Sequence, residues 1–194
     1  MNTPNQSLDE PVKISTIKIE NIVASMDLEE KFDLEHIYAA LDNADYDKKK
    51  FPGLVYRLKD PKTAFLLFAS GKANCTGAKS IESVDRAIEK LTADLQKLGY
   101  TVNSKPKYVV QNIVAAADLG TELNLNAIAI GVGLEYVEYE PEVFPGLVYR
   151  IANPKVVVLI FRSGKLVITG AKTDTECEQA REIVKNELDN LGLL

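Results

Sequence analysis

Few residues of this 194-residue chain have the types and spacing that catalysis requires. The single histidine, His36, lies in a short helical pattern, where a surface position is more common than a catalytic base. Two glycine-rich stretches, GKANCTGAKS from Gly71 and GKLVITGAKT from Gly164, superficially resemble a phosphate loop. They depart from it, because five residues rather than four separate the glycines and alanine follows where lysine is needed. We therefore do not expect an enzyme.

The cysteines and the hydropathy pattern narrow the class of protein further. Cys75 and Cys177 form neither a CxxC pair nor a dense disulfide framework, which favours a reducing cytoplasm and leaves a bridge between them open. No apolar run approaches the roughly 18–20 residues that span a bilayer, and the N-terminus lacks a signal-peptide pattern. We expect no metal, no cofactor and no membrane association.

The strongest pattern is an internal repeat. Residues 51–79, FPGLVYRLKDPKTAFLLFASGKANCTGAK, return as residues 144–172, FPGLVYRIANPKVVVLIFRSGKLVITGAK, with 18 of 29 positions identical. The motif NIVA occurs at Asn21 and again at Asn112, at an offset of 91 rather than 93, so a two-residue indel separates the copies. Two units, 12–104 and 105–194, after a polar leader over 1–11 that we expect to be disordered, predict a pseudo-twofold molecule. Duplex DNA is the best-known partner with nearly twofold symmetry.

Each unit repeats the same order of predicted elements: a strand, a short helix, three strands in quick succession and a long amphipathic helix. They span 13–24, 33–43, 54–58, 63–70, 73–76 and 80–98 in the first unit, and 107–116, 124–132, 147–151, 156–163, 166–169 and 173–191 in the second. Ser80 is a fitting helix cap, and Gly99 and Gly192 are fitting stops. This order predicts an α+β fold.

One strand of each unit is apolar on both faces. In residues 64–70, Phe65 and Leu67 alternate with Leu66 and Phe68, and residues 157–163 show the same pattern. Two apolar faces normally mean that both are covered, yet each unit supplies only one long helix. The other face is therefore expected to be an exposed apolar surface, which usually marks an interaction site.

The charge is acidic overall but uneven. A net charge of −5 argues mildly against a nucleic-acid partner. The first unit is balanced, with 14 basic and 14 acidic residues, whereas the second has 9 basic and 12 acidic residues. The segment DYDKKK at 45–50 corresponds to EYVEYEPE at 135–142, so the two units share a scaffold but present different edges.

The motif order NIVA, FPGLVYR, Phe-x-Ser-Gly-Lys and TGAK, present twice, resembles the TATA-box-binding protein family over essentially all of residues 12–192. The short leader and acidic composition are more similar to the archaeal branch. The resemblance implies a pseudo-twofold saddle, with a curved antiparallel ten-stranded sheet and four helices on its convex face. It also implies a general transcription factor of the archaeal cytoplasm and nucleoid, monomeric on TATA-box DNA. Its uncovered concave face leaves open a homodimer in the free state.

The resemblance assigns DNA-contacting residues to this sequence. Two phenylalanine pairs, Phe51 with Phe68 and Phe144 with Phe161, would insert into the minor groove and kink the duplex, as is known of this family. The base-contacting residues would be Asn21, Asn112, Thr76 and Thr169 as hydrogen-bonding groups and Val23, Val114, Leu66, Leu159 and Val167 as an apolar floor. Asn74 stands where the second unit has Val167 and the family usually keeps an apolar residue. Whether it shifts the preference of one half-site or adds a hydrogen bond is open.

The remaining implied contacts lie around this surface. Phosphates would meet Arg57, Lys72, Lys79 and Ser70 in the first unit and Arg150, Lys165, Lys172 and Ser163 in the second. Transcription factor B would contact Glu140, Glu142 and Val143, and RNA polymerase would be recruited indirectly. The alternative is a duplicated saddle-shaped sheet that binds a ligand or a protein without TATA specificity, because a fold does not fix a function.

Overall fold

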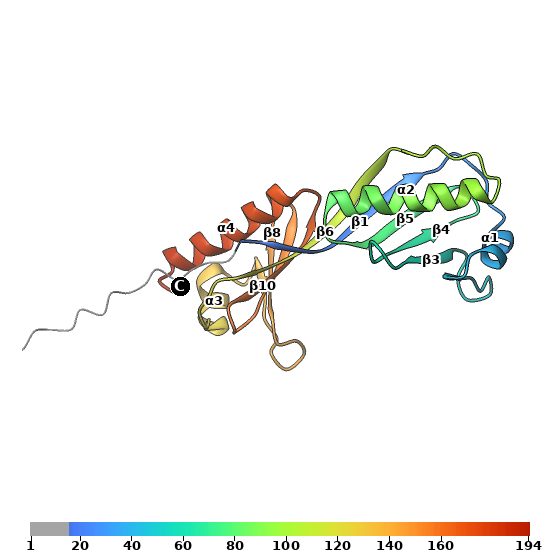
Figure 1. Ribbon diagram of the computed structural model, residues 1–194. Helices are drawn as coiled ribbons and strands as arrows, with labels where there is room; N and C mark the ends of the chain where they lie inside the picture. Colours follow the sequence, from blue (N-terminus) through green and yellow to red (C-terminus); the bar gives the residue numbers. More distant parts are fainter. Residues whose placement is uncertain (1–15) are drawn as a thin grey trace, which may run out of the picture.

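The computed structural model describes residues 16–194, and the predicted leader, residues 1–11, lies outside them. The described chain forms one ten-stranded antiparallel sheet with the order β2-β3-β4-β5-β1-β6-β10-β9-β8-β7. Strands β1 (Lys18–Asp27) and β6 (Tyr108–Asp118) pair at its centre. The two repeats therefore lie on either side of this central pair, as Figure 1 shows.

The two repeats contain the same series of elements. The first continues with α1 (Leu34–Ala40), β2 (Ala44–Asp45), β3 (Leu54–Leu58), β4 (Thr63–Leu67), β5 (Lys72–Ala78) and α2 (Ile81–Lys97); the second with α3 (Leu125–Val132), β7 (Val137–Glu138), β8 (Leu147–Ile151), β9 (Val156–Ile160), β10 (Lys165–Ala171) and α4 (Asp174–Asn190). The predicted α+β order is confirmed. The two-residue strands β2 and β7, which no sequence pattern indicated, complete the ten strands that the resemblance implied.

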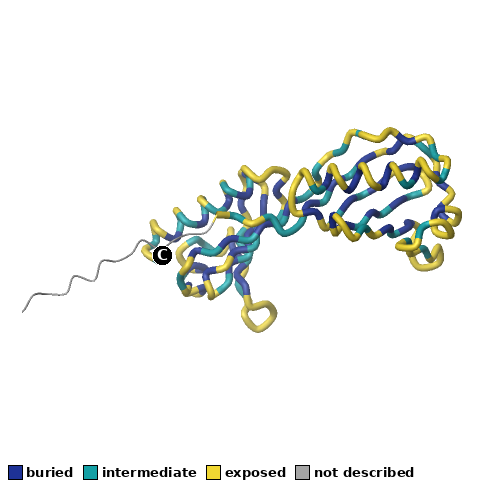
Figure 2. Tube along the Cα trace, viewed as in Figure 1, coloured by how far each residue is buried: buried dark blue, intermediate teal, exposed yellow. Residues whose placement is uncertain are grey.

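The helices pack on one face of the curved sheet. Helix α2 lies against β1 and β5, and α4 lies against β6 and β10. The short helices α1 and α3 lie beside the outer strands β2 and β7. Buried side chains of all four helices join a single apolar core. Figure 2 shows buried residues concentrated in the sheet and on the inner helix surfaces, and exposed residues in the loops.

Local signals set the ends of the long helices. The Ser80 hydroxyl accepts a hydrogen bond from the Ser83 N–H (3.1 Å), and the Thr173 hydroxyl accepts one from the Glu176 N–H (3.2 Å). Gly99, with a φ of +92°, follows α2 in the left-handed region that glycine tolerates best. The predicted caps and stops are thus confirmed.

Several predicted strand ends were misplaced. Strand β4 ends at Leu67 and not at Ser70, because the chain turns at once. The Phe68 N–H donates to the Lys72 carbonyl (3.0 Å), and Gly71 closes the turn with a φ of +96°. The first strand, predicted over 13–24, begins at Lys18 within the described residues and runs on to Asp27.

Both cysteines are buried and free. Burial raises the pKa of the Cys75 thiol to about 12 and is the main cause that raises the pKa of the Cys177 thiol to about 11. Cys75 packs in the core as a small hydrophobic residue, as its alignment with Ile168 indicated. Among the described helices, none is long and apolar enough to cross a membrane.

Candidate nucleic-acid interface

Within residues 16–194, one face of the sheet carries no helix, and we call it the uncovered face. Its residues alternate with the core residues along the strands and meet one another across the ladder, as the register shows. They include Asn21, Val23, Ser25, Val55, Arg57, Ala64, Leu66, Asn74 and Thr76 in the first repeat and Asn112, Val114, Ala116, Val148, Arg150, Val157, Leu159, Val167 and Thr169 in the second. All ten predicted base-contacting residues lie on this face.

Burial distinguishes the two faces. On β4, Phe65 and Leu67 are fully buried beneath the helices, whereas Leu66 between them is only partly covered. On β9, Val158 is fully buried and Leu159 is partly covered in the same way. The expected exposed apolar surface is therefore present in both repeats. It is a mostly apolar surface that solvent reaches.

Near the centre of the uncovered face, each repeat holds one asparagine in a fixed orientation. The Asn21 Oδ1 accepts a hydrogen bond from the Gly77 N–H (2.7 Å), and its Nδ2 donates to the Thr76 hydroxyl (3.3 Å). In the second repeat, the Asn112 Oδ1 accepts from the Gly170 N–H (2.7 Å). Its Nδ2 donates to the Thr169 hydroxyl (3.4 Å).

This arrangement decides which groups the asparagines can offer. Because the backbone N–H occupies the amide oxygen, each side chain is held with its NH₂ group free to make one more donation. Two such donors, related by the pseudo-twofold axis, lie near the centre of a mostly apolar surface. A partner that presents hydrogen-bond acceptors and no donors fits this pattern.

Two phenylalanine pairs lie toward the outer ends of the uncovered face. The rings of Phe51 and Phe68 have their centroids 6.0 Å apart at an interplanar angle of 65°. The rings of Phe144 and Phe161 are also 6.0 Å apart, at 68°. Phe51 and Phe144 keep 41% and 38% of their surface exposed, although large aromatic side chains are usually well covered. The structure thus brings together both pairs that the sequence predicted.

A glycine beneath each pair provides the space for the rings. An added Cβ at Gly53 would lie 2.7 Å from the Phe51 ring and 3.0 Å from the Phe68 ring. The Gly146 position gives the same two distances to Phe144 and Phe161. Sequence reasoning did not assign a role to these glycines, although the repeated motif FPG placed both beside a phenylalanine.

The predicted phosphate-contacting cations differ in their surroundings. Arg57, Lys72, Lys165 and Lys172 are exposed, and within residues 16–194 no acidic side chain lies within ion-pairing distance of them. Arg150 pairs with Glu138 at 3.2 Å. Ser70 and Ser163 are exposed in the turns after β4 and β9. Six of these seven groups are therefore available to a partner without breaking an ion pair.

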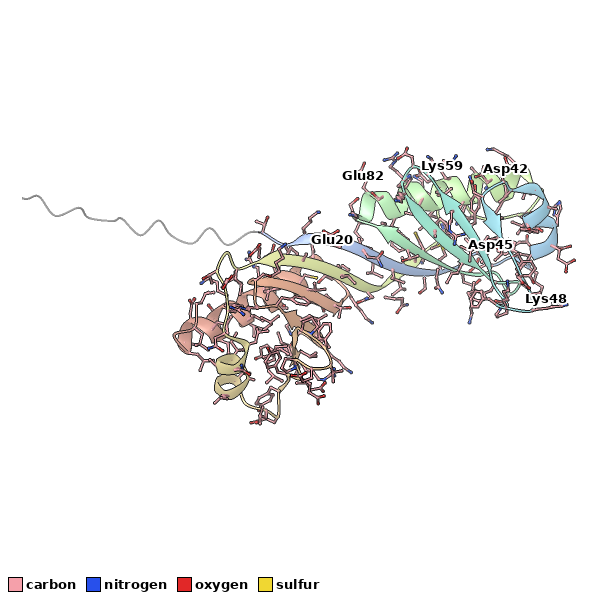
Figure 3. The ribbon with its side chains drawn as sticks, turned by 90° about the horizontal axis from the view of Figure 1, so that it is seen from below. Glu20, Asp42, Asp45, Lys48, Lys59 and Glu82 are labelled. Carbon is pink, nitrogen blue, oxygen red and sulfur yellow. The ribbon has the colours of Figure 1, made fainter. Side chains whose placement is uncertain are left out.

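Lys79 is also paired, through a residue that no sequence pattern indicated. Glu20 forms ion pairs with Lys79 (3.1 Å) and Lys18 (3.0 Å). Hydrogen bonds from Lys18 and then Lys79 hold the pKa of the Glu20 carboxyl below its usual range, so it is charged at neutral pH. Figure 3 shows Glu20 near the junction of the two halves. Comparing the repeats at Glu20 and Gln111 would have revealed this difference.

The loops at the outer ends of the molecule carry opposite charges. Lys48 lies at the far end of the first repeat, with Lys49 and Lys50 beside it in sequence (Figure 3). The corresponding loop of the second repeat exposes Glu140, Glu142 and Val143, and Val143 keeps 79% of its surface exposed. The predicted asymmetry of the edges is therefore present in the fold.

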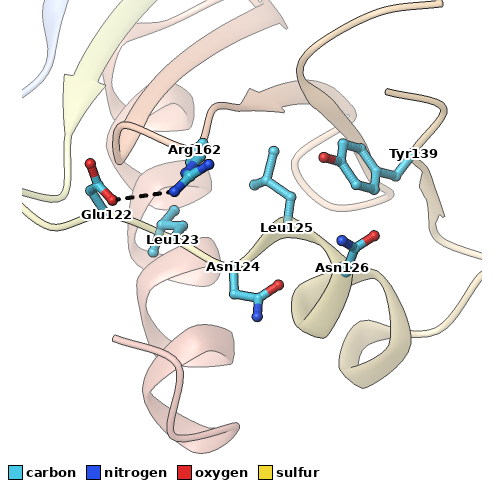
Figure 4. A pocket seen from close by; sticks show the side chains of 7 residues that line it. All are labelled: Glu122, Leu123, Asn124, Leu125, Asn126, Tyr139 and Arg162. Carbon is cyan, nitrogen blue, oxygen red and sulfur yellow. Dashed lines mark ion pairs between the residues drawn. The ribbon is translucent and has the colours of Figure 1, made fainter. Parts of the chain in front are cut away.

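A hollow lies outside the uncovered face, beside helix α3. It measures about 460 Å³ and is bordered by the start of α3, Tyr139 and the Glu122–Arg162 ion pair, as Figure 4 shows. The two paired side chains are about 80% exposed, and the Asn124 side chain already caps the helix by accepting from the Ala127 N–H. No group of three or more potential metal ligands occurs within the described residues.

Comparison with known proteins supports this picture. Residues 16–98 and 107–191 each match the family described as transcription factor TFIID, or TATA-binding protein. The TATA-box-binding protein of Methanothrix thermoacetophila is 60% identical over 181 residues, covering 93% of this chain and 99% of the relative. That of Archaeoglobus fulgidus is 54% identical over 178 residues, covering 92% and 97%.

A solved structure extends the likeness from sequence to fold. The TBP of Methanococcus jannaschii superposes with a TM-score of 0.84 and 49% identity, covering 91% of this chain and 99% of that chain. Both repeats are matched, and the likeness spans nearly the whole length of each relative. The chain therefore belongs to the TATA-box-binding protein family, whose members are DNA-binding general transcription factors.

Proposed function

We propose that this chain is an archaeal transcription initiation factor that binds the minor groove of TATA-box DNA and kinks it with its phenylalanine pairs. The observation that carries the proposal is the uncovered apolar face, with an exposed phenylalanine pair toward each end and two oriented amides at its centre. It acts on the nucleoid in the cytoplasm, by binding rather than by catalysis.

The chemistry of the uncovered face suits A·T pairs. In the minor groove, A·T and T·A pairs present only the acceptors adenine N3 and thymine O2. The free N–H groups of Asn21 and Asn112 are donors that such acceptors satisfy. A guanine would push its amino group against apolar side chains such as Val114 and Leu159, which offer it no acceptor.

The phenylalanine pairs suit a bent duplex. Bending DNA strongly costs on the order of 1–10 kcal/mol, and pyrimidine–purine steps such as TA bend most easily. The rigid, exposed rings of Phe51 and Phe144, each supported by a second ring, are suited to enter a base step. We propose that the flexible TA steps of the element are the positions where they insert.

The proposal is tested by energy transfer between the ends of a short labelled duplex that contains an A·T-rich TATA element. Wild-type protein should increase the transfer on this duplex and not on a G·C-substituted duplex of equal length. The double variant Phe144→Ala/Phe161→Ala should lose most of the bend. Tyr38→Ala, which removes an exposed aromatic ring from α1, is the matched control.

The other outcomes discriminate between functions. Tight binding to the A·T-rich duplex without bending would retain DNA as the partner and reject the wedge. Binding to neither duplex would reject the proposal and favour the alternative, a saddle whose uncovered face binds a protein or a ligand. Equal binding to both duplexes would reject TATA specificity.

We further propose that transcription factor B docks on the acidic loop before Phe144 and so recruits RNA polymerase. Asp47 corresponds to Glu140, but lysines stand in the first repeat where the second has Glu142 and the exposed Val143, so this contact distinguishes the two ends of the molecule. Glu140→Arg/Glu142→Arg should abolish the complex of protein, DNA and factor B in a gel-shift assay while DNA binding persists. Asp42→Arg, exposed in the first repeat, is the control. Loss of both complexes together would reject this docking site.

The oligomeric state follows from the same surface. We propose a monomer on DNA, because one copy already supplies both halves of a nearly twofold interface. In the free state, the apolar uncovered face is available for a homodimer. DNA should therefore dissociate such a dimer, which sedimentation of the free and bound protein would reveal.

A further inference from the structure

The two halves of the uncovered face differ at one pair of facing residues. Asn74 on β5 lies directly opposite Ser25 on β1. At the equivalent place in the second repeat, Val167 on β10 lies opposite Ala116 on β6. On the outer side the two positions match, because Asn74 faces Leu66 as Val167 faces Leu159, whereas on the inner side Ser25 faces Val109 and Ala116 faces Lys18. A polar pair thus replaces an apolar pair on one side of the pseudo-twofold axis only.

The Asn74 amide is available to a partner. It is partly buried, and within the described part of the chain no hydrogen bond involves its side chain. With Ser25, Phe68 and Lys72, it lines a hollow of about 610 Å³ on the uncovered face. The Ser25 hydroxyl accepts a hydrogen bond from Gln111 Nε2 (2.7 Å), which leaves its own hydrogen to donate. Both polar groups therefore have unused capacity in the same hollow.

The position of Asn74 limits which base pair it can reach. It precedes Thr76, which belongs to the central asparagine cluster, by two residues on the same strand and face. The hollow that it lines also reaches Phe68 of the outer pair. Asn74 therefore lies between the centre of the interface and its first-repeat end. It would face a base pair inside one half-site.

If the proposed function holds, on which this step rests, the chemistry of that base pair follows. A G·C pair differs from an A·T pair in the minor groove by the guanine N2 amino donor. The Asn74 Oδ1 can accept that hydrogen bond, while its Nδ2 or the Ser25 hydroxyl can donate to the neighbouring base acceptors. Val167 and Ala116 can do neither, so the same base pair would leave an unsatisfied amino group under the second repeat.

We infer that the Asn74–Ser25 pair makes the first repeat accept a G·C pair that the second repeat excludes. A promoter element with one G·C pair in one half-site then binds with that half under the first repeat. The uncovered face itself thereby sets the direction of the protein on the DNA, in addition to any contact at the end loops.

The test uses duplexes built on a self-complementary A·T element. One set carries a single G·C pair in one half, scanned through its inner positions, and a second set carries it symmetrically in both halves. For each protein, the dissociation constant is divided by its value on the A·T element, so any general change in affinity cancels. An unaccommodated pair should cost at least about five-fold. Wild type should tolerate the single pair at one position and lose at least about five-fold when both halves carry it.

Two matched variants exchange the residues of the repeats. Asn74→Val should make the single G·C pair as costly as an unaccommodated one. Val167→Asn, which places the amide in the second repeat, should restore binding to the element with a G·C pair in both halves. Each variant takes the residue found at the equivalent position of the other repeat, so both are expected to fold, and thermal melting confirms this.

Results that would overturn this inference differ from the result that would overturn the proposed function. An Asn74→Val variant with the same ratio of dissociation constants as wild type would overturn the inference, as would a wild type that loses affinity equally with one and two G·C pairs. Failure of the wild type to bind the A·T element would instead overturn the proposed function. That result is visible in the first titration, before any G·C pair is introduced.

Discussion

At the scale of single residues, the absence of a side chain at two positions shapes the interface as much as the aromatic rings do. Gly53 and Gly146 are buried below the phenylalanine pairs, and the rings occupy the volume where a Cβ would stand. Neither glycine has a positive φ, so alanine is compatible with the backbone and conflicts only with the rings. Substitution therefore perturbs the ring positions selectively.

Gly146→Ala should displace Phe144 and Phe161 and reduce DNA bending. Making room for an extra methyl group in a packed site costs about 1–3 kcal/mol, which should lower the melting temperature by several degrees at most. The bend is measured by energy transfer on the labelled TATA duplex. Ala69→Ser, at an exposed turn position, is the control. A full bend together with unchanged melting would contradict the assigned role of the glycine.

At the scale of elements, one hydrogen bond joins the outer strand β3 of the first repeat to the long helix α2. The Tyr56 hydroxyl on β3 donates to Asp94 Oδ2 on α2 (2.8 Å), and the tyrosine ring is 6% exposed. Burial, and then the Asp94 carboxylate, raise the pKa of Tyr56 above its ordinary value. The neutral phenol is thus the form that the folded state stabilises.

Tyr56→Phe should lower the free energy of unfolding by about 1 kcal/mol at neutral pH, because one hydrogen bond is lost. Since the folded pKa lies above the unfolded value of about 10, the contribution of Tyr56 is complete below pH ~10 and declines above it. The difference between variant and wild type should therefore shrink as the pH rises past that point. Urea unfolding at several pH values measures it, and a constant difference would contradict this account.

The elements were largely predictable because their signals are local. Helix α2 was visible from its apolar spacing, its Ser80 cap and the stop at Gly99. Strands β2 and β7 were not, because two residues carry no alternation and are fixed only by pairing with β3 and β8. The end of β4 was predicted wrongly for a similar reason, since the turn after Phe68 depends on hydrogen bonds across it.

For the candidate site, the repeat supplied what local patterns could not. The matched phenylalanines and asparagines were identified because each occurs twice in the same context. The roles predicted for them remain predictions. Side chains that act through tertiary contacts, such as Glu20 on Lys79 and Gln111 on Ser25, were missed because strand pairing brings them together.

At the scale of the whole molecule, the distribution of charge reconciles an acidic chain with a phosphate-bearing partner. Helix α4 contains six acidic residues, on the face of the sheet opposite the uncovered one. The uncovered face carries Arg57 and Arg150 and, where its central strands end, Asp27 opposite Lys72 and Asp118 opposite Lys165, so cations outnumber carboxylates on it. The net charge of −5 is a property of the whole chain and does not indicate how well the uncovered face can bind DNA.

Glu20→Gln should strengthen DNA binding by about two- to five-fold at moderate salt, because Lys79 no longer exchanges an internal ion pair for a phosphate. With about six phosphate contacts, the logarithm of the association constant should fall with the logarithm of salt concentration at a slope near −5. Glu82→Gln, which removes the same charge from α2, is the control that Figure 3 allows the reader to locate. If both variants gain the same affinity for DNA, the gain comes from the change in net charge and not from the release of Lys79.

The shortness of the outermost strands has a consequence for how the free protein behaves in solution. The sheet ends at β2 and β7, which offer only two residues of open backbone each, too little to recruit a further strand. Stacking of molecules edge to edge into fibres is thereby blocked at both ends of the sheet. We therefore expect any association between free copies to use the uncovered face, where the proposed binding of DNA would also reduce aggregation.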